Sequence, residues 1–121
     1  MYLRQVNPEL RVYVVEPWGA DSLATCCCCD AGHGIQGGGY GKEDLAQMRG
    51  VSVDGYFKVT DEEAAEGARI LAREEGIFAG YSTGAQVQAA IGLLRGEERG
   101  KVVGLLACDS GMKYFSTGLW G

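Results

Sequence analysis

The sequence predicts an α/β fold, in which helices pack on a mostly parallel sheet. Short apolar runs alternate with helical segments in the order strand, helix, strand, helix, strand, which is typical of this class. The run at residues 101–107 is apolar almost throughout, as in a parallel strand that is buried on both faces. With 121 residues, the chain is long enough for one domain with a modest core.

The chain opens with a helical segment and a strand. Residues 1–6 have the character of a helix end, which Asn7 and Pro8 would stop. The β-branched run at residues 11–16 predicts the first strand, and Pro17 closes it.

Residues 18–41 predict a loop rich in glycine and cysteine, and residues 42–49 predict a short helix. Four of the five cysteines are consecutive, from Cys26 to Cys29. Zinc ligands are normally spaced as C-x2-C pairs, and disulfide frameworks also need spacing. We therefore interpret these thiols as a reduced, structural or incidental run, with a metal site as the alternative. Cys108, at the end of the last apolar run, is expected to be small and buried.

A second strand and a capped helix follow. Residues 55–59 predict the strand. Thr60 and Glu63 form a capping box at the start of the helix, and Gly76 provides its stop signal. The expected buried face of this helix is narrow and consists mostly of small residues: Ala64, Ala65, Ala68, Leu71 and Ala72.

Two more elements precede the last strand. Residues 77–79 predict a very short strand. Ser82 or Thr83 is expected to open a helix at residues 85–94, which ends at Gly96.

Composition limits the classes of partner. The net charge of −5 disfavours an electrostatic grip on nucleic acid or on an anionic membrane. No apolar run approaches the roughly 20 residues of a membrane span, and the first residues do not resemble a signal peptide. We therefore expect a cytoplasmic protein that binds a small molecule and no nucleic acid or membrane.

The polar turn after the last predicted strand is the sharpest candidate site. Ser110 lies there, between Asp109 and Gly111. Ligands of open α/β sheets bind at the carboxyl ends of the strands, where a hydroxyl can hydrogen-bond a ring nitrogen. The alternative is a serine that only caps a turn. Residues 82–84 likewise predict either an anion site at a helix start or a simple N-cap.

A glycine cluster is the second candidate. Gly37 to Gly39, followed by Tyr40, would let the backbone approach a flat or anionic ligand. A mobile loop is the alternative, because the cluster lacks the ending of a P-loop and the context of a dinucleotide fingerprint. His33, the single histidine, is either a base or, as we favour, a loop residue that makes a backbone hydrogen bond.

Taken together, these segments resemble the C-terminal part of cysteine synthase. More broadly, they are similar to the pyridoxal-phosphate-dependent β-family of fold type II, which includes cystathionine β-synthase and threonine synthase. The similarity extends over nearly the whole chain, in six segments in the family's order: residues 7–17, 33–37, 53–56, 60–64, 75–85 and 109–117. The chain departs from the family pattern at Gly38, Lys42 and Cys26 to Cys29.

The resemblance implies a partial tryptophan-synthase-β-like fold with three layers, and pyridoxal 5'-phosphate as the cofactor of the complete enzyme. It implies that Ser110 hydrogen-bonds the pyridine nitrogen, that Gly37 and Gly39 line the cofactor, and that Tyr40 lies on the substrate side. Residues 1–121 would form the C-terminal part of the large domain, with the catalytic lysine and the phosphate-binding loop upstream. No catalytic residue is therefore carried over.

The implied activity is β-replacement on O-acetylserine or serine with sulfide or a thiol, in cysteine biosynthesis. The substrate would be a small amino acid, and the complete enzyme a homodimer. This chain alone is expected to be inactive. Two alternatives stay open: a cystathionine β-synthase-like enzyme, and a non-catalytic α/β interaction module.

Overall fold

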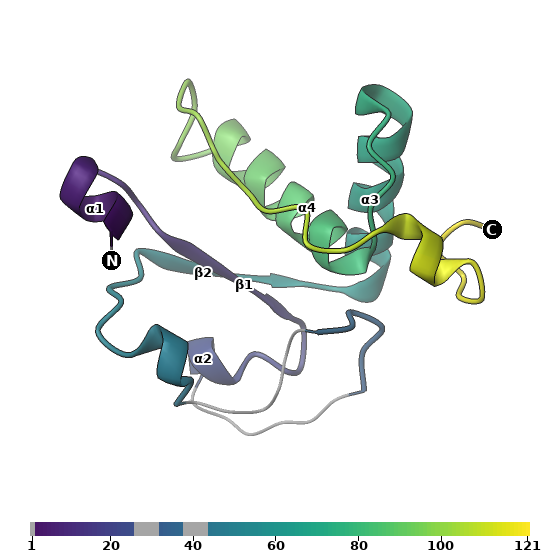
Figure 1. The fold of residues 1–121 in the computed structure, drawn as a ribbon, viewed down its shortest axis with the longest axis horizontal. Helices are drawn as coiled ribbons and strands as arrows, with labels where there is room; N and C mark the ends of the chain where they lie inside the picture. Colours follow the sequence, from purple (N-terminus) through teal and green to yellow (C-terminus); the bar gives the residue numbers. More distant parts are fainter. Residues whose placement is uncertain (1, 26–31, 38–43) are drawn as a thin grey trace.

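A computed structural model describes residues 2–25, 32–37 and 44–121, and it confirms the α/β class (Figure 1). Several residues singled out in the sequence lie outside the described part: Cys26 to Cys29, Gly38, Gly39, Tyr40 and Lys42. With η for a 3-10 helix, the elements in chain order are α1 (Tyr2–Val6), β1 (Tyr13–Pro17), α2 (Ser22–Thr25), η1 (Ala46–Met48), β2 (Gly55–Val59), α3 (Asp61–Glu75), α4 (Tyr81–Arg95) and η2 (Gly111–Tyr114).

The sheet of the described part consists of β1 and β2, which pair in parallel from Tyr13–Gly55 to Pro17–Val59. The strand predicted at residues 55–59 is confirmed, and the one predicted at 11–16 begins two residues later. Helices α3 and α4 lie on one side of the strands and the short α2 on the other (Figure 1). This arrangement gives a small α/β unit with helices on both sides of the sheet.

Both predicted ends of α3 are confirmed. The amide of Glu63 donates to Thr60 Oγ1 at 3.2 Å, and the amide of Thr60 donates to Glu63 Oε2 at 2.9 Å, which completes the capping box. Gly76 ends the helix with φ of 69°, a left-handed conformation that favours glycine. The sequence therefore encodes this helix locally.

Helices α3 and α4 pack with their backbones almost in contact. A Cβ atom on Gly84 would lie within 3.0 Å of the Ala64 carbonyl oxygen, and one on Gly67 would overlap the Gly84 carbonyl. The small face of α3 predicted from the sequence is the surface that receives α4, and Ala64 and Ala68 are fully buried there. Glycine at the crossing is thus a packing requirement.

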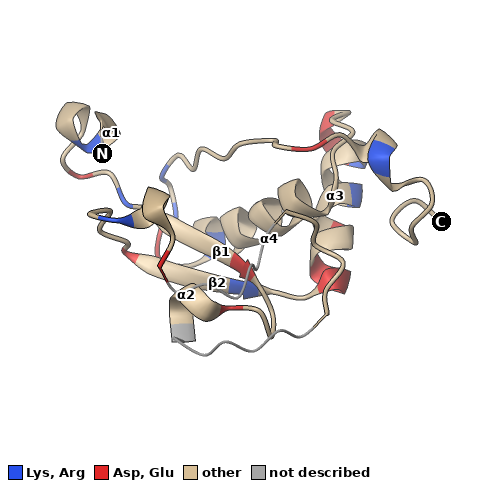
Figure 2. Ribbon diagram, turned by 60° about the horizontal axis from the view of Figure 1, so that its bottom comes forward, with Lys and Arg blue, Asp and Glu red and all other residues tan. Residues whose placement is uncertain are grey.

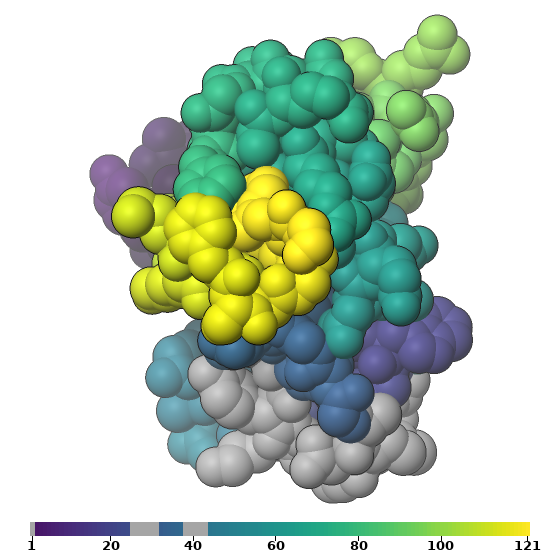
Figure 3. All heavy atoms as spheres, turned by 90° about the vertical axis from the view of Figure 1, so that its right-hand side faces the viewer, coloured from purple at the N-terminus to yellow at the C-terminus, as the bar shows by residue number. Residues whose placement is uncertain are grey.

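The C-terminal residues fold back onto α3, as the space-filling view shows (Figure 3). Arg69 of α3 donates from Nε to the Leu119 carbonyl oxygen at 2.9 Å and from Nη2 to that of Gly118 at 3.0 Å. Leu119 and Tyr114 are buried in one cluster with alanines of α3. This contact fixes the segment that carries Asp109 and Ser110.

The buried strand predicted at residues 101–107 is wrong for this structure. The segment is extended but belongs to no strand, and Val102 and Leu106 are 98% and 73% exposed. A strand buried on both faces needs a neighbour on the sheet and helices above and below. Among the described residues, β1 and β2 pair only with each other. Cys108 is likewise exposed and not buried.

Several predicted boundaries also differ. Helix α4 begins at Tyr81 with Gly80 as its N-cap, so Ser82 and Thr83 lie in its first turn and do not cap it. The short strand predicted at residues 77–79 is reduced to one antiparallel bridge between Ala79 and Ser110. Of the helix predicted at 42–49, the described part contains η1.

Candidate functional site

A cavity of about 480 Å³ opens at the carboxyl end of β1. Its walls come from residues 15–17, residues 35–37, the beginning of α4, residues 108–109 and the end of η2. The volume is within the range of small-molecule sites, roughly 300–1,000 Å³. The location matches the crevice expected from the sequence, at the carboxyl end of a parallel strand.

Asp109 lines this cavity, and it caps α4 although it is far from that helix in the sequence. Its Oδ1 accepts from the Thr83 amide at 3.3 Å and from Thr83 Oγ1 at 2.6 Å, and its Oδ2 accepts from the Tyr114 hydroxyl at 2.8 Å. Gly80, the formal N-cap, has no side chain for this task, and a Cβ there would overlap Asp109 and Tyr114. The amides of Ser82 and Thr83 thus face an internal carboxylate, which corrects the N-cap interpretation.

These hydrogen bonds keep the Asp109 carboxylate ionised. Burial alone would raise the pKa of Asp109, but donation from Thr83, Tyr114 and backbone amides outweighs it and holds the pKa below the ordinary value. Burial and the neighbouring carboxylate raise the pKa of Tyr114 to about 12. At neutral pH the pair is therefore an ionised Asp109 beside a protonated Tyr114.

Ser110 lies directly after Asp109, which lines the cavity, but Ser110 does not itself belong to the cavity wall. Its backbone is held by the bridge to Ala79, and its Oγ accepts from the Met112 amide at 3.3 Å. The hydroxyl therefore caps η2, which was the alternative interpretation from the sequence. The side chain is exposed, and no hydrogen bond within the described ranges uses its proton, so it remains a donor.

Gly37 lies in the cavity wall, in the segment of residues 35–37. Its φ is 84°, and a Cβ at this position would meet nothing within 4 Å. The segment is attached to α4 because Ser82 Oγ donates to the Gln36 carbonyl oxygen at 2.7 Å. The structure thus brings Gly37 and the Ser110 turn to the same cavity.

The two acidic residues of the cavity are both satisfied internally. Glu16 is 5% exposed and accepts from the Leu23 and Ala24 amides at 3.0 and 2.9 Å, so it caps α2. In the register of the sheet it is the partner of Lys58, and the acidic position of β1 and the basic position of β2 lie side by side in Figure 2. The Lys58 ammonium pairs with Asp21. Lys113 is the cationic side chain in the described cavity wall.

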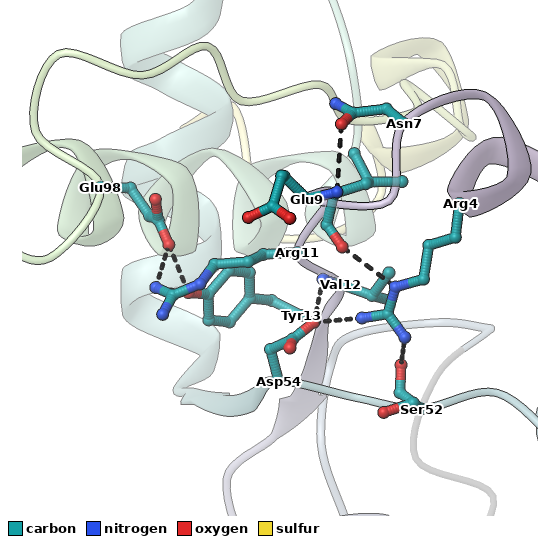
Figure 4. Close-up of polar contacts among 10 residues, drawn as sticks. Arg4, Asn7, Glu9, Arg11, Val12, Tyr13, Ser52, Asp54 and Glu98 are labelled. Atoms are coloured by element: carbon teal, nitrogen blue, oxygen red, sulfur yellow. Dashed lines mark hydrogen bonds and ion pairs between the residues drawn. The ribbon is translucent and has the colours of Figure 1, made fainter.

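A polar cluster outside the cavity holds the far end of β1 (Figure 4). Arg4 pairs with Asp54, whose carboxylate also accepts from the Val12 amide at 2.7 Å. Figure 4 also shows Glu98 Oε1 with Arg11 and Tyr13.

In that second group, Glu98 Oε1 accepts from Arg11 at 2.5 Å and from the Tyr13 hydroxyl at 2.7 Å. Hydrogen bonds from Tyr13 and Arg11 lower the pKa of Glu98, and the bond to Glu98 raises that of Tyr13 to about 12. The contact joins β1 to the turn that follows α4.

Sequence reasoning missed the roles of Glu16, Thr83 and Tyr114, because their partners are 5 to 26 positions away along the chain. The polar turn after an apolar run of sequence is the signal that points to Asp109 and Ser110. For His33, the expected backbone hydrogen bond is not seen: Nδ1 is buried without a partner in the described part of the chain.

Within the described ranges, no group of three or more His, Cys, Asp and Glu side chains could hold a metal ion. The same ranges contain no helix that is long and apolar enough to cross a membrane.

The comparison with protein-family models shows which family this chain belongs to. Residues 1–109 match the family described as pyridoxal-phosphate dependent enzyme. The chain belongs to this family. Relatives include a probable cysteine synthase of Bacillus subtilis, 35% identical over 98% of this chain and 37% of the relative. Cysteine synthase 3 of Caenorhabditis elegans is 34% identical over 98% of this chain and 35% of its own length.

Comparison with solved structures supports the same family assignment. O-acetylserine dependent cystathionine β-synthase from Helicobacter pylori superposes with a TM-score of 0.83 at 29% identity, over 98% of this chain and 38% of that chain. The resemblance to cysteine synthase and its fold type is thereby confirmed. The chain spans 37% of the Bacillus subtilis relative and 35% of the Caenorhabditis elegans one.

The described residues fit a pyridoxal-phosphate ring on one side. The cavity has room for a small ligand, Gly37 leaves its wall free of a side chain, and Ser110 offers an uncommitted hydroxyl donor next to Asp109 in the chain. A neutral donor suits an aromatic nitrogen acceptor.

Proposed function

We propose that this chain supplies one wall of the cofactor site in a cysteine-synthase-like enzyme, and that residues 1–121 form the C-terminal part of its large domain. The observation that carries the proposal is the Ser110 turn, held beside the cavity by Asp109 in a chain that matches the family over residues 1–109. The proposed reaction is β-replacement on O-acetylserine or serine with sulfide or a thiol.

Pyridoxal phosphate, when bound, supplies an electron sink for loss of the β-substituent. We assign the Ser110 hydroxyl to the ring nitrogen. A hydroxyl is a very weak acid, so it donates a hydrogen bond and keeps its proton, and the nitrogen stays neutral. Gly37 and Gly39 would keep side chains away from the ring, and Tyr40 would lie on the substrate side.

We also propose that this chain does not catalyse the reaction alone. None of its lysines, Lys42, Lys58, Lys101 and Lys113, matches the position of the family's cofactor-holding lysine. The purified chain, given pyridoxal phosphate, O-acetylserine and sulfide, is expected to release no cysteine. Clear turnover would overturn this part of the proposal.

The first experiment is the intact mass of the protein from its native source, detected with an antibody against residues 113–121. A mass more than twice that of this chain means that the natural product carries the lysine half. A mass equal to this chain means that a second chain supplies that half or that the protein has left catalysis.

The role of Ser110 is tested in the cofactor-loaded protein by Ser110→Ala, with Ser116→Ala as the matched control, since Ser116 is exposed outside the cavity wall. Loss of a hydrogen bond to a ligand acceptor costs about 1–3 kcal/mol, so we expect pyridoxal phosphate to bind about tenfold more weakly. Equal affinities of the two variants, measured by titration of cofactor absorbance, would remove Ser110 from the site.

Two alternatives have their own support. The Helicobacter pylori neighbour favours a cystathionine β-synthase-like reaction, which the choice between sulfide and a larger thiol would reveal. A non-catalytic α/β module is favoured if the chain is monomeric and well ordered in solution. Aggregation or dimerisation through the open residues 101–107 favours the enzyme.

A further inference from the structure

Two neighbouring residues of different charge lie at the cavity, the Asp109 carboxylate and the Ser110 hydroxyl. Asp109 lines the cavity, and Ser110 follows it in the chain. An opposite charge within about 4–6 Å favours the charged form of a titrating group, so a carboxylate beside a ring nitrogen favours its protonation. A hydroxyl leaves the nitrogen neutral. The side chain that hydrogen-bonds the ring nitrogen therefore determines whether that nitrogen is protonated.

In the structure, hydrogen bonds within the protein occupy both oxygens of one of these two residues, Asp109. Both oxygens of Asp109 are engaged, Oδ1 by the Thr83 amide and hydroxyl and Oδ2 by the Tyr114 hydroxyl. The amide belongs to the first turn of α4, whose dipole also favours a carboxylate at this end. Ser110, by contrast, uses only its acceptor side, toward the Met112 amide.

We infer that Thr83 and Tyr114 are positioning residues that hold the Asp109 carboxylate against α4, so that the neutral Ser110 hydroxyl is the partner of the ring nitrogen. This inference rests on the proposed function. Thr83 and Tyr114 act through Asp109, and they set the charge state of the cofactor ring, not merely the stability of the turn.

Other ionisable groups lie at the same cavity, and the variants of Thr83 and Tyr114 described below leave them in place. Glu16 approaches from β1 and is buried with its oxygens on the α2 amides. Cys108 and Lys113 line the cavity, and the ring of Tyr81 packs edge-on against Tyr114 at 5.4 Å between centroids. Variants that leave these groups in place therefore report on Asp109.

The first measurement needs no cofactor. A carboxyl-carbon NMR titration of the full chain follows Asp109 in the wild type, in Thr83→Val with Tyr114→Phe, and in the control Thr83→Ser, which keeps the hydroxyl. The double variant removes two donors that lower the pKa of Asp109, so that pKa is expected to rise, while the control stays near the wild type. An unchanged pKa in the double variant would show that these hydroxyls do not hold the carboxylate.

The second measurement uses the protein loaded with pyridoxal phosphate, and it follows the ring nitrogen by nitrogen NMR across pH. In the double variant, the freed carboxylate is expected to raise the pKa of the ring nitrogen by about one unit or more, as for an opposite charge nearby. Adding Asp109→Asn to the double variant should return it to the wild-type value. Loss of packing alone would not be reversed by removing a charge.

The outcomes separate the two proposals. A wild-type protein that contains this chain together with the lysine half, and that still binds no pyridoxal phosphate, overturns the proposed function and, with it, this inference. Normal binding with an unshifted ring nitrogen in the double variant overturns the inference alone. Should the double variant not fold, Tyr114→Phe, which removes a single atom, carries the same prediction with a smaller shift, and an unshifted value there has the same meaning.

Discussion

The Asp109 side chain shows how one residue can replace a local cap. Gly80 leaves the first turn of α4 without a side-chain acceptor, and the carboxylate 29 positions later accepts from the Thr83 amide. A helix N-terminus needs such an acceptor, and a charged one gains from the helix dipole. The cap of α4 and the placement of Ser110 therefore depend on the same carboxylate.

The stabilising role of Asp109 should depend on pH. Its pKa is lowered in the folded chain, so its contribution is present above the unfolded value of about 3.9 and is lost as pH falls through the folded value. Asp109→Asn is expected to melt below the wild type at neutral pH. The difference in melting temperature should begin to shrink as the pH falls below about 3.9, because the unfolded wild type then binds a proton that the folded carboxylate still resists.

Calorimetry of both proteins over this pH range is the check. Other acidic groups, such as Glu98, titrate equally in the two proteins, so only the difference between the two curves is informative. A gap of constant size at every pH would contradict the role assigned to the ionised carboxylate.

At the scale of elements, the crossing of α3 and α4 depends on two glycines. Gly67 and Gly84 allow the two backbones to touch, and the first turn of α4, with Ser82 and Thr83, begins next to this point. The position of the cavity wall is therefore set by backbone packing, with little freedom left to side chains.

Two alanine substitutions in α4 should have opposite effects. Gly84→Ala would place a Cβ against the Ala64 carbonyl, and we expect a loss of about 1–3 kcal/mol or more, as for overpacking. Gly92→Ala, in the same helix, would find its nearest neighbour at 3.9 Å, on Phe57, and should gain about 0.5–1 kcal/mol from helix propensity. Urea unfolding measures both, and effects of the same sign would refute the crossing geometry.

The elements that the sequence predicts well are those encoded by neighbours along the chain. The caps of α3 and the strand at residues 55–59 need only adjacent residues, and both are confirmed. The start of α4 was misplaced because its acceptor is distant. Residues 101–107 were misread because apolar composition shows a need for burial and cannot show whether a neighbouring strand is there.

The candidate site follows the same division. The polar turn after an apolar run is visible in the sequence, so Ser110 and its neighbour Asp109 can be named as candidates from the sequence alone. That Thr83 and Tyr114 engage the carboxylate, or that Glu16 caps α2, depends on tertiary contacts and left no local pattern.

At the scale of the molecule, polar contacts fasten the C-terminal segment to α3 and the beginning of β1 to the turn after α4. Arg69 fastens the C-terminal segment, and Glu98 fastens β1 through Arg11 and Tyr13. Between these two regions, residues 101–107 cross the surface with little cover. This segment is the least protected long stretch after α4.

Limited proteolysis should therefore cut residues 105–106 early. Leu105 and Leu94 are similarly exposed, at 41% and 38%, but Leu94 lies in α4 while Leu105 lies in an extended segment. Proteases bind extended chain, so chymotrypsin is expected to cleave after Leu105 or Leu106 well before Leu94. Mass spectrometry of a time course gives the order, and Leu105→Ser with Leu106→Ser should delay the first cut. Early cleavage at Leu94 would mean that α4 opens more readily than its packing implies.

The same open stretch bears on the fate of the protein in a living cell. An extended apolar segment is the form in which chaperones and degradation machinery engage their clients, and engagement competes with burial. The rate at which this chain is degraded should then depend on how quickly residues 101–107 become buried. Its cellular level should rise with the concentration of a partner that buries them.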